Sequence, residues 1–303
     1  MRPTSTTRKR GSSVSYFPFC PGVAWKTRRG KYIVPELSAD AWEKAVGDRE
    51  PVVLCGGGLL EGFFSLAVVS ALRKQLGRQI SWCGPEVART LCEAQGLAAP
   101  IDPLPADLCA RFPLPIFMDA EDRVYFNLLC GYEELVSIRQ LETRPNPALY
   151  AAHICSGSLL PWSVQHLPSF RGFGAEEEVV VAPDELGWNL TETKRAVEGL
   201  RARKLRVLVL PGRPHAFPGI AGVEQFSAER WVSAASAAQL AVTGDPRLAL
   251  VAVGAGATFV LTRTSSDPRV DPGRTADFLG TRTVILTTSS PSPSEVVSFA
   301  AAL

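Results

Sequence analysis

Residues 51–77 decide the fold class, and they read PVVLCGGGLLEGFFSLAVVSALRKQLG. The first five residues are apolar and predict a strand buried in a parallel sheet. The three glycines that follow predict a tight turn, and residues 61–77 predict an amphipathic helix that ends at the glycine. A strand, a turn and a helix in this order are typical of a βαβ unit in an open parallel sheet.

The same alternation continues beyond this stretch. Residues 79–84 (QISWCG) predict a second strand, and residues 85–96 (PEVARTLCEAQG) predict a short helix with a proline in its first turn and a glycine at its end. Residues 101–115 are rich in proline and less regular, and residues 116–135 predict a turn followed by a strand or a helix. Residues 143–176 mix prolines, glycines and aromatic residues, so we expect a linker there.

A second alternating set of strands and helices begins after the linker. Strands are predicted at 177–183, 205–212, 240–244, 258–262 and 281–288, and helices at 190–204, 226–239, 246–256 and 292–303. Asn189 or Thr191 is available to cap the first of these helices. The two sets predict an α/β protein with two facing Rossmann-like domains, parallel sheets and a cleft between them.

The composition excludes several classes of protein. The 303 residues, 46% of them hydrophobic, are enough for two domains at roughly 100–200 residues each. A charged fraction of 20% and a net charge of +2 exclude a disordered polyelectrolyte and a broadly basic nucleic-acid-binding protein. The apolar runs are too short for a transmembrane helix, and the amino terminus lacks the apolar segment of a signal peptide. We therefore expect a soluble protein of the cytoplasm.

Metal and redox chemistry find little support. The seven cysteines include no pair at CxxC spacing, and their odd number argues against a disulfide framework. The three histidines are few and scattered, so the sequence predicts no metal site and no cofactor.

Residues 1–50 differ in composition from the rest. Basic residues gather at Arg2, Arg8–Arg10, Lys26, Arg28–Arg29 and Lys31, around the aromatic and proline-rich stretch YFPFCPGVAW. Residues 1–14 cannot bury a core and are expected to be disordered unless a partner orders them. The whole segment predicts an arm that contacts a protein partner or an anionic surface, or else packs loosely on its own domain. Binding of nucleic acid would rest on this arm alone and would be nonspecific.

The strongest local candidate for a site is the turn formed by Gly56, Gly57 and Gly58. Glycines let a backbone approach a ligand closely, and the helix N-terminus that follows favours negative charge. The turn matches neither the dinucleotide-binding GxGxxG pattern nor a phosphate-binding Walker loop, because no GK[ST] follows. A purely structural turn would explain it equally well. Glu61 is either a favourable acid in the first helical turn or a carboxylate directed into the cleft.

Three segments resemble the ADP-heptose:lipopolysaccharide heptosyltransferases (glycosyltransferase family 9, GT-B fold). They are residues 56–76 (GGGLLEGFFSLAVVSALRKQL), 187–212 (GWNLTETKRAVEGLRARKLRVLVLPG) and 237–268 (AAQLAVTGDPRLALVAVGAGATFVLTRTSSDP). They occur in the family's order and cover about a third of the chain. In register, Leu60–Glu61 falls on the family's Gly-Asp, Trp188 on the Trp of its second-domain segment, and Asp245 on the Asp of its DSGxxH motif.

The resemblance implies a GT-B fold, with a 51–165 acceptor domain and a 166–303 nucleotide-sugar domain behind the 1–50 arm. It also implies inverting, metal-independent transfer of a hexosyl- or heptosyl-type sugar from a nucleotide-diphosphate donor to a hydroxyl, such as that of a glycan acceptor. Glu61 would be the general base. Gly56, Gly57 and Gly58, with Arg213, Asp245 and Arg247, would bind the donor and its phosphates.

The sequence also departs from the family. The small hydroxyl and the glycine of DSGxxH are Pro246 and Arg247 here, and the position of its histidine is Leu250. Proline removes an N–H donor. The basic residue that the family carries before its Trp is absent near Leu186–Gly187. These losses leave an alternative open, in which the chain is a catalytically degenerate GT-B scaffold that acts as a structural, assembly or interaction protein through its arm.

Overall fold

The structure is a computed structural model. It describes residues 23–26, 32–33, 47–56, 58–96, 98–100, 111–116, 134–137, 177–265, 270, 272–279 and 281–303. The predicted linker, the domain boundary predicted between residues 165 and 166, and residues 1–14 all lie outside these ranges.

The first unit, residues 51–116, contains a parallel sheet in the order β5-β4-β3-β6. Its elements are β3 (Pro51–Cys55), α2 (Leu59–Leu76), β4 (Ser81–Cys83), α3 (Glu86–Gln95), β5 (Ala99–Pro100) and β6 (Phe112–Ile116). The predicted strands and helices of residues 51–96 are confirmed. Gly77 and Gly96 end the two helices with φ values of 63° and 54°, a left-handed conformation that glycine adopts without strain.

Strand β6 lies in a stretch for which the sequence predicts no regular structure. It reads FPLPI and pairs with β3 in parallel register, Val53 opposite Leu114. Proline lacks an N–H and is therefore confined to the edge of a sheet, where the unpaired side of the strand faces outward. Pro113 and Pro115 are two residues apart, so their nitrogens point to the same side of this edge strand.

Helix α2 is covered on nearly every side. Residues 62–69 are buried without interruption, and the prediction of an amphipathic helix is therefore wrong. The reason is that α2 packs against its own sheet on one side and against α8 (Pro246–Ala255) of the second unit on the other. A helix that is apolar all round is typical of this two-sided burial.

The second unit, residues 177–303, contains a five-stranded parallel sheet in the order β12-β11-β10-β8-β9. Its strands are β8 (Val179–Ala182), β9 (Val207–Val209), β10 (Leu240–Thr243), β11 (Phe259–Arg263) and β12 (Val284–Thr288). Its helices are α6 (Leu190–Arg201), α7 (Ala228–Ala237), α8, α9 (Pro272–Leu279) and α10 (Pro293–Ala300). All the predicted elements of this unit are present, Asn189 caps α6, and the sequence analysis missed only the eight-residue α9 among these helices.

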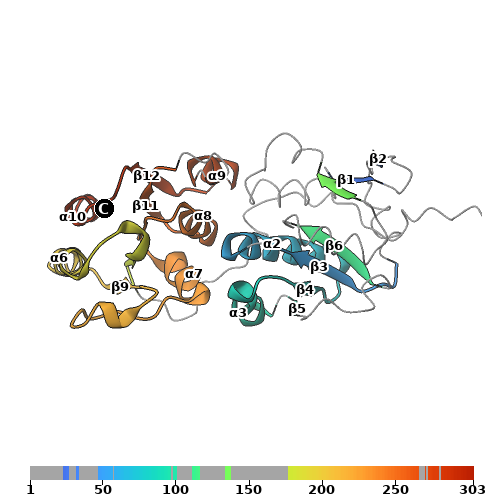
Figure 1. Cartoon of the computed structure of the whole chain (residues 1–303), viewed down its shortest axis with the longest axis horizontal. Helices are drawn as coiled ribbons and strands as arrows, with labels where there is room; N and C mark the ends of the chain where they lie inside the picture. The colour runs from blue at the N-terminus through green and yellow to red at the C-terminus, as the bar shows by residue number, and fades with distance from the viewer. Residues whose placement is uncertain are drawn as a thin grey trace, which may run out of the picture.

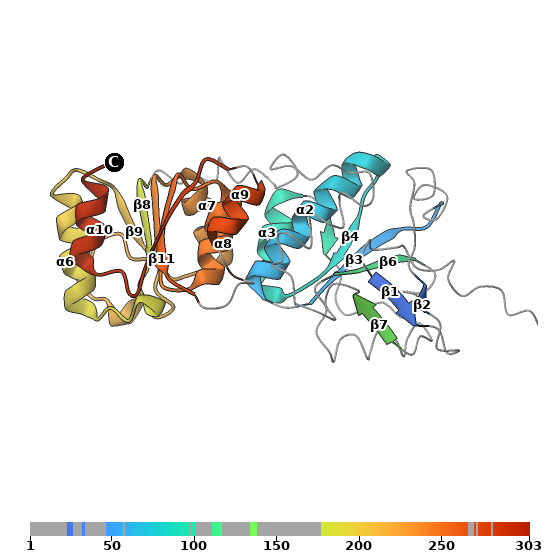
Figure 2. The same cartoon turned by 90° about the horizontal axis from the view of Figure 1, so that it is seen from above.

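The helices cover both faces of the second sheet. Helices α6 and α10 lie on one face, and α7, α8 and α9 lie on the other, which faces the first unit (Figure 2). The hydrophobic core on the α6 and α10 side includes Val242, Leu261 and Val296. The core on the other side continues without a break from the second unit into the first.

The two units meet through helices. Helix α2 packs on α8, and α3 packs on α7, so the helices lie between the two sheets (Figures 1 and 2). A close approach involves Gly254, where an added Cβ would lie 2.6 Å from Cε1 of Phe63 and 3.3 Å from Cζ of Phe64. Glycine is therefore needed at this position because the aromatic rings of α2 occupy the space of a side chain.

Part of the predicted arm pairs with a later segment of the chain. Strands β1 (Val23–Lys26) and β2 (Tyr32–Ile33) form an antiparallel sheet with β7 (Glu134–Ser137), in the order β2-β1-β7. This sheet lies on the side of the first unit that faces away from the second unit (Figure 2). None of the described helices is long and apolar enough to cross a membrane.

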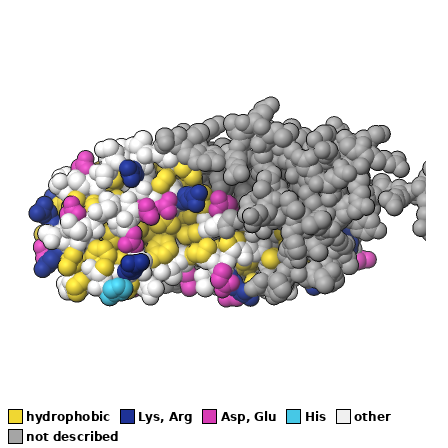
Figure 3. Space-filling view, viewed as in Figure 1, with side chains coloured by type: hydrophobic (Ala, Val, Ile, Leu, Met, Phe, Trp, Pro, Cys, Tyr) yellow, Lys and Arg dark blue, Asp and Glu magenta, His cyan; other side chains and the backbone are white. Residues whose placement is uncertain are grey.

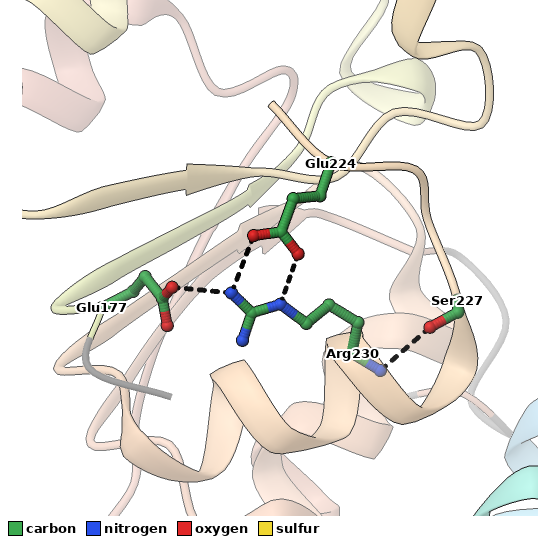
Figure 4. A network of polar contacts seen from close by, with 4 residues as sticks. All are labelled: Glu177, Glu224, Ser227 and Arg230. Carbon is green, nitrogen blue, oxygen red and sulfur yellow. Dashed lines mark hydrogen bonds and ion pairs between the residues drawn. The ribbon is translucent and has the colours of Figure 1, made fainter. Parts of the chain in front are cut away.

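An ion cluster ties α7 to the loops around β8 and β9. The Arg230 guanidinium donates to both carboxylate oxygens of Glu224, at 2.7 and 3.0 Å, and to Oε1 of Glu177 at 2.7 Å (Figure 4). The backbone N–H of Arg230 donates to Oγ of Ser227, the residue that caps α7. The hydrogen bonds from Arg230 are the largest cause that lowers the pKa of Glu224 from its ordinary value of 4.5.

This lowered pKa predicts a pH dependence of stability. A carboxyl whose pKa is lower in the folded than in the unfolded chain stabilises the fold above its unfolded pKa, and the contribution is lost as the pH falls through the folded pKa. As the pH is lowered from 4.5, the urea concentration at the unfolding midpoint is expected to decrease more steeply for the wild type than for Glu224→Gln. Glu198→Gln, which removes an exposed carboxylate on α6, serves as the control and should follow the wild type. Parallel curves for the wild type and Glu224→Gln would contradict the prediction.

Candidate functional site

The carboxyl ends of the parallel strands of the second unit bring together Arg213, Asp245 and Arg247. Arg213 follows β9, while Asp245 and Arg247 follow β10. Strand β8 lies between β9 and β10, so the two loops leave the sheet two strands apart, at a spacing of about 10 Å. Ligands of open α/β sheets bind at this edge, beyond the carboxyl ends of the strands.

Asp245 is the N-cap of α8. Its Oδ1 accepts a hydrogen bond of 2.8 Å from the backbone N–H of Arg247, and its own N–H donates to Oγ1 of the buried Thr243 at 3.1 Å. One of the helix's free N–H groups is therefore already satisfied by Asp245. Pro246 occupies the first helical position, where its missing N–H costs no hydrogen bond within the helix.

Both arginines of this edge present their side chains to solvent. Arg213 and Arg247 are exposed, and so is His215, which follows Arg213 in the same loop. The structure thus leaves the two guanidinium groups accessible to an anion. Leu250, at the position of the family's histidine, is fully buried in the core. It cannot take over the role of a polar ligand.

The predicted residues of the first unit lie at the end of β3 and the start of α2. Gly56 follows β3, Gly58 is the N-cap of α2, and Gly57 lies outside the described residues. Glu61 is in the first turn of α2, and its Oε2 accepts a hydrogen bond of 2.9 Å from the backbone N–H of Gly58. The carboxylate thus stabilises the N-terminus of its own helix, the ordinary role considered for it above.

The fold itself does not require glycine at position 58. Its φ of −112° is one that any residue adopts, and among the described residues an added Cβ would meet Oε2 of Glu61, at 3.8 Å. By contrast, a Cβ at Gly62 would overlap Ala88 of α3. Gly62 is therefore explained by helix packing, whereas no contact with the described residues explains the glycine at position 58.

The structure brings the predicted residues together in two sets, one on each unit. Within the described part of the chain, no hydrogen bond or ion pair joins Gly56, Gly58 or Glu61 to the arginines and Asp245 of the second unit. On the face of the second unit seen in Figure 3, acidic and basic side chains are interspersed.

Asp184, which was not among the predicted site residues, lies at the same edge as the arginines. Its Oδ2 accepts a hydrogen bond of 2.5 Å from the backbone N–H of Gly212, the residue before Arg213. A signal was available in the sequence, because Asp184 follows a predicted strand directly and precedes a glycine within the stretch PDELGW.

Three cysteines lie in the described part of the chain. Cys55 and Cys92 are buried and Cys83 is half-buried, all three as free thiols. Burial raises the pKa of the Cys92 thiol to about 11, so this side chain stays protonated at neutral pH. The described residues include no group of three or more histidine, cysteine, aspartate or glutamate side chains that could hold a metal ion.

Comparison with known proteins identifies the fold. No family model matches the chain, and no curated protein matches its sequence. Among solved structures, E. coli heptosyltransferase WaaC with ADP is similar at a TM-score of 0.56 and 12% identity, covering 82% of this chain and 98% of that one. A family 9 glycosyltransferase from Veillonella parvula (TM-score 0.55, 11% identity) covers 84% and 96%. E. coli ADP-heptose LPS heptosyltransferase II (TM-score 0.53, 13% identity) covers 84% and 98%.

These similarities confirm the predicted α/β class with parallel sheets, whereas the cleft predicted between the two domains stays a prediction. The chain is an α/β protein with parallel sheets and the GT-B fold of heptosyltransferases, over more than four fifths of its length. The resemblance that the three sequence segments indicate thus holds at the level of the fold. Because a shared fold does not fix a function, the activity has to be argued from the residues of the site.

Proposed function

We propose that this chain is a glycosyltransferase of the heptosyltransferase type, which transfers a sugar from a nucleotide-diphosphate donor to a hydroxyl of a glycan or another acceptor. The edge of the second sheet supports this proposal, because two exposed arginines lie there beside the N-terminus of α8. Its fold neighbour WaaC was solved with ADP, a nucleoside diphosphate.

The donor's diphosphate would bind along this edge. Arg213 and Arg247 can each donate two parallel hydrogen bonds to phosphate oxygens, and the N-terminus of α8 adds a favourable dipole. Their positive charge offsets the charge that grows on the diphosphate as it leaves. Asp245 would order the start of α8 rather than contact the phosphates, since its carboxylate already caps the helix.

The chemical step in this proposal is a single displacement that inverts the configuration at the anomeric carbon of the sugar. The acceptor oxygen attacks the anomeric carbon, the bond to the diphosphate oxygen breaks, and its electron pair leaves with the diphosphate. Glu61 would take the proton of the acceptor hydroxyl. No metal and no cofactor take part in the step as proposed.

A thermal-shift panel tests the donor site. We expect sugar donors of one nucleotide class, among ADP, UDP, GDP and CDP, to raise the melting temperature, because a ligand at a hundredfold excess over its Kd stabilises a protein by about 2.7 kcal/mol. Arg247→Ala should abolish the shift. Arg203→Ala, which removes an exposed arginine at the opposite edge of the sheet, should retain it. No shift with any donor at millimolar concentration would contradict the proposal.

Specific observations favour a second candidate, a degenerate scaffold. The Glu61 and Asp245 carboxylates both cap their own helices, Pro246 offers no N–H, and the family's histidine position is a buried leucine. In that case the protein acts through its arm on a protein partner. A wild type that binds no donor while retaining a cooperative fold would favour this candidate. For either function we propose the cytoplasm as the location.

A further inference from the structure

The loop formed by residues 183–188 connects β8 to α6 at the edge that carries the arginines. It begins with a single 3-10 turn, η4 (Asp184–Leu186), in which the N–H of Leu186 donates to the carbonyl of Pro183 at 3.0 Å. Gly187 ends the turn in the left-handed region, with a φ of 72°. The loop thus has a defined local structure of its own.

A hydrogen bond joins the 183–188 loop to the loop after β9. Oδ2 of Asp184 accepts the backbone N–H of Gly212 at 2.5 Å. An added Cβ at Gly212 would lie 3.2 Å from the same oxygen, so the two loops are in close contact. Because Gly212 directly precedes Arg213, this bond fixes the backbone from which the Arg213 side chain projects.

A second contact joins the 183–188 loop to the turn after β10. An added Cβ at Gly244 would overlap the carbonyl of Glu185 and lie 2.7 Å from the nitrogen of Leu186. Only glycine therefore allows the two backbones to pack together here. Gly244 directly precedes Asp245, the N-cap of the helix that carries Arg247.

The loop is anchored in turn to the body of the second unit. Leu186 and Trp188 are each 7% exposed and pack in the core on the α6 side. Nε1 of Trp188 donates to the carbonyl of Pro291 at 2.9 Å, which ties the loop to the segment between β12 and α10. The core and the segment before α10 therefore hold the 183–188 loop in place.

We propose that the 183–188 loop is a brace that positions both arginine-bearing loops, and that Asp184 is the positioning residue for Arg213. The brace, which follows β8, contacts the segments that follow β9, β10 and β12, so it sets the spacing between the backbones that carry Arg213 and Arg247. The expected effect of the brace on ligand affinity rests on the function proposed above. The expected effect of the brace on the backbone at Gly212 is independent of that function.

Hydrogen exchange tests the brace without any ligand. In Asp184→Ala, amide exchange in peptides covering residues 210–216 should be at least tenfold faster than in the wild type, because Gly212 loses its acceptor. Asp184→Asn keeps a carbonyl oxygen that accepts the same bond and should restore most of the protection. Glu185→Ala removes the neighbouring exposed carboxylate and should leave the exchange unchanged. Equal exchange in the wild type and Asp184→Ala would overturn the brace.

Titration with ADP, UDP, GDP and CDP separates this inference from the proposed function. We expect the affinity of Asp184→Ala for the nucleotide that the wild type binds to fall about tenfold, and that of Asp184→Asn to stay near the wild type. Faster exchange in Asp184→Ala with unchanged affinity would overturn the positioning role. A wild type that binds none of the four nucleotides would overturn the proposed function, while the exchange measurement would still decide whether the brace exists.

Discussion

Phe63→Ala is expected to lower the free energy of unfolding of the whole chain by about 3–5 kcal/mol. The Phe63 side chain is fully buried, and its ring lies against Phe64, with centroids 5.2 Å apart, and against Gly254 of the second unit. The substitution would leave a cavity between α2 and α8. Because each helix is held by its own sheet, the two helices cannot easily move together to close it. Such a loss is a large part of the 5–15 kcal/mol that stabilises a typical domain.

Urea unfolding measures this effect, and hydrogen exchange shows where it is felt. Since the core is continuous across α2 and α8, we expect a single transition and a loss of protection in both helices. Val284→Ala, at a side chain that is 47% exposed, is the control and should change the stability by no more than about 0.5 kcal/mol. A loss below 1 kcal/mol for Phe63→Ala, or an α8 that keeps its wild-type protection, would refute the shared core.

Glu61→Gln is expected to slow cleavage of the sugar donor by about 10²- to 10⁴-fold, the contribution typical of a general base. The amide of glutamine still has an oxygen that accepts the N–H of Gly58, so the cap of α2 is retained. The substitution therefore removes the base while preserving the structural role of the residue. The rate of donor cleavage is measured as the release of nucleoside diphosphate, with the sugar donor that raises the melting temperature as the substrate.

The two roles considered for Glu61 predict different outcomes. If the carboxylate only caps the helix, Glu61→Gln leaves donor cleavage and the melting temperature close to the wild type, and the assignment of Glu61 as the base is wrong. If it is the base, the rate falls while the melting temperature and the donor-induced shift remain. Glu192→Gln in the corresponding capping position of α6 is the matched control, because Oε2 of Glu192 accepts the N–H of Asn189 in the same way.

Most of the second unit could be predicted from local patterns in the sequence. Its strands are short apolar runs, and its helices begin at residues such as Asn189, Ser227 and Ser292, whose side chains accept N–H groups of the first turn. The exceptions have physical reasons. Strand β6 of the first unit was not predicted because it contains two prolines, which only an edge position permits, and the eight-residue α9 is the one described helix of the second unit that was not predicted.

Contacts between distant segments could not be predicted in this way. The uninterrupted burial of α2 depends on α8, almost 200 positions later in the chain, and the sequence of α2 alone does not reveal this partner. Likewise, the glycines at 56–58 draw attention as a turn, whereas Gly244 and Gly254 are among the positions where packing demands glycine. Asp184 acquires its role only because β8 and β9 are neighbours in the sheet.

The most direct test of the proposed function is hydrogen exchange of the wild-type chain with and without ADP, UDP, GDP and CDP at millimolar concentration. If the chain binds a nucleotide-diphosphate donor at the carboxyl edge of the second sheet, one of these nucleotides will slow exchange in peptides covering residues 210–216 and 243–248. Unchanged exchange in both segments with all four nucleotides would contradict the proposed donor site.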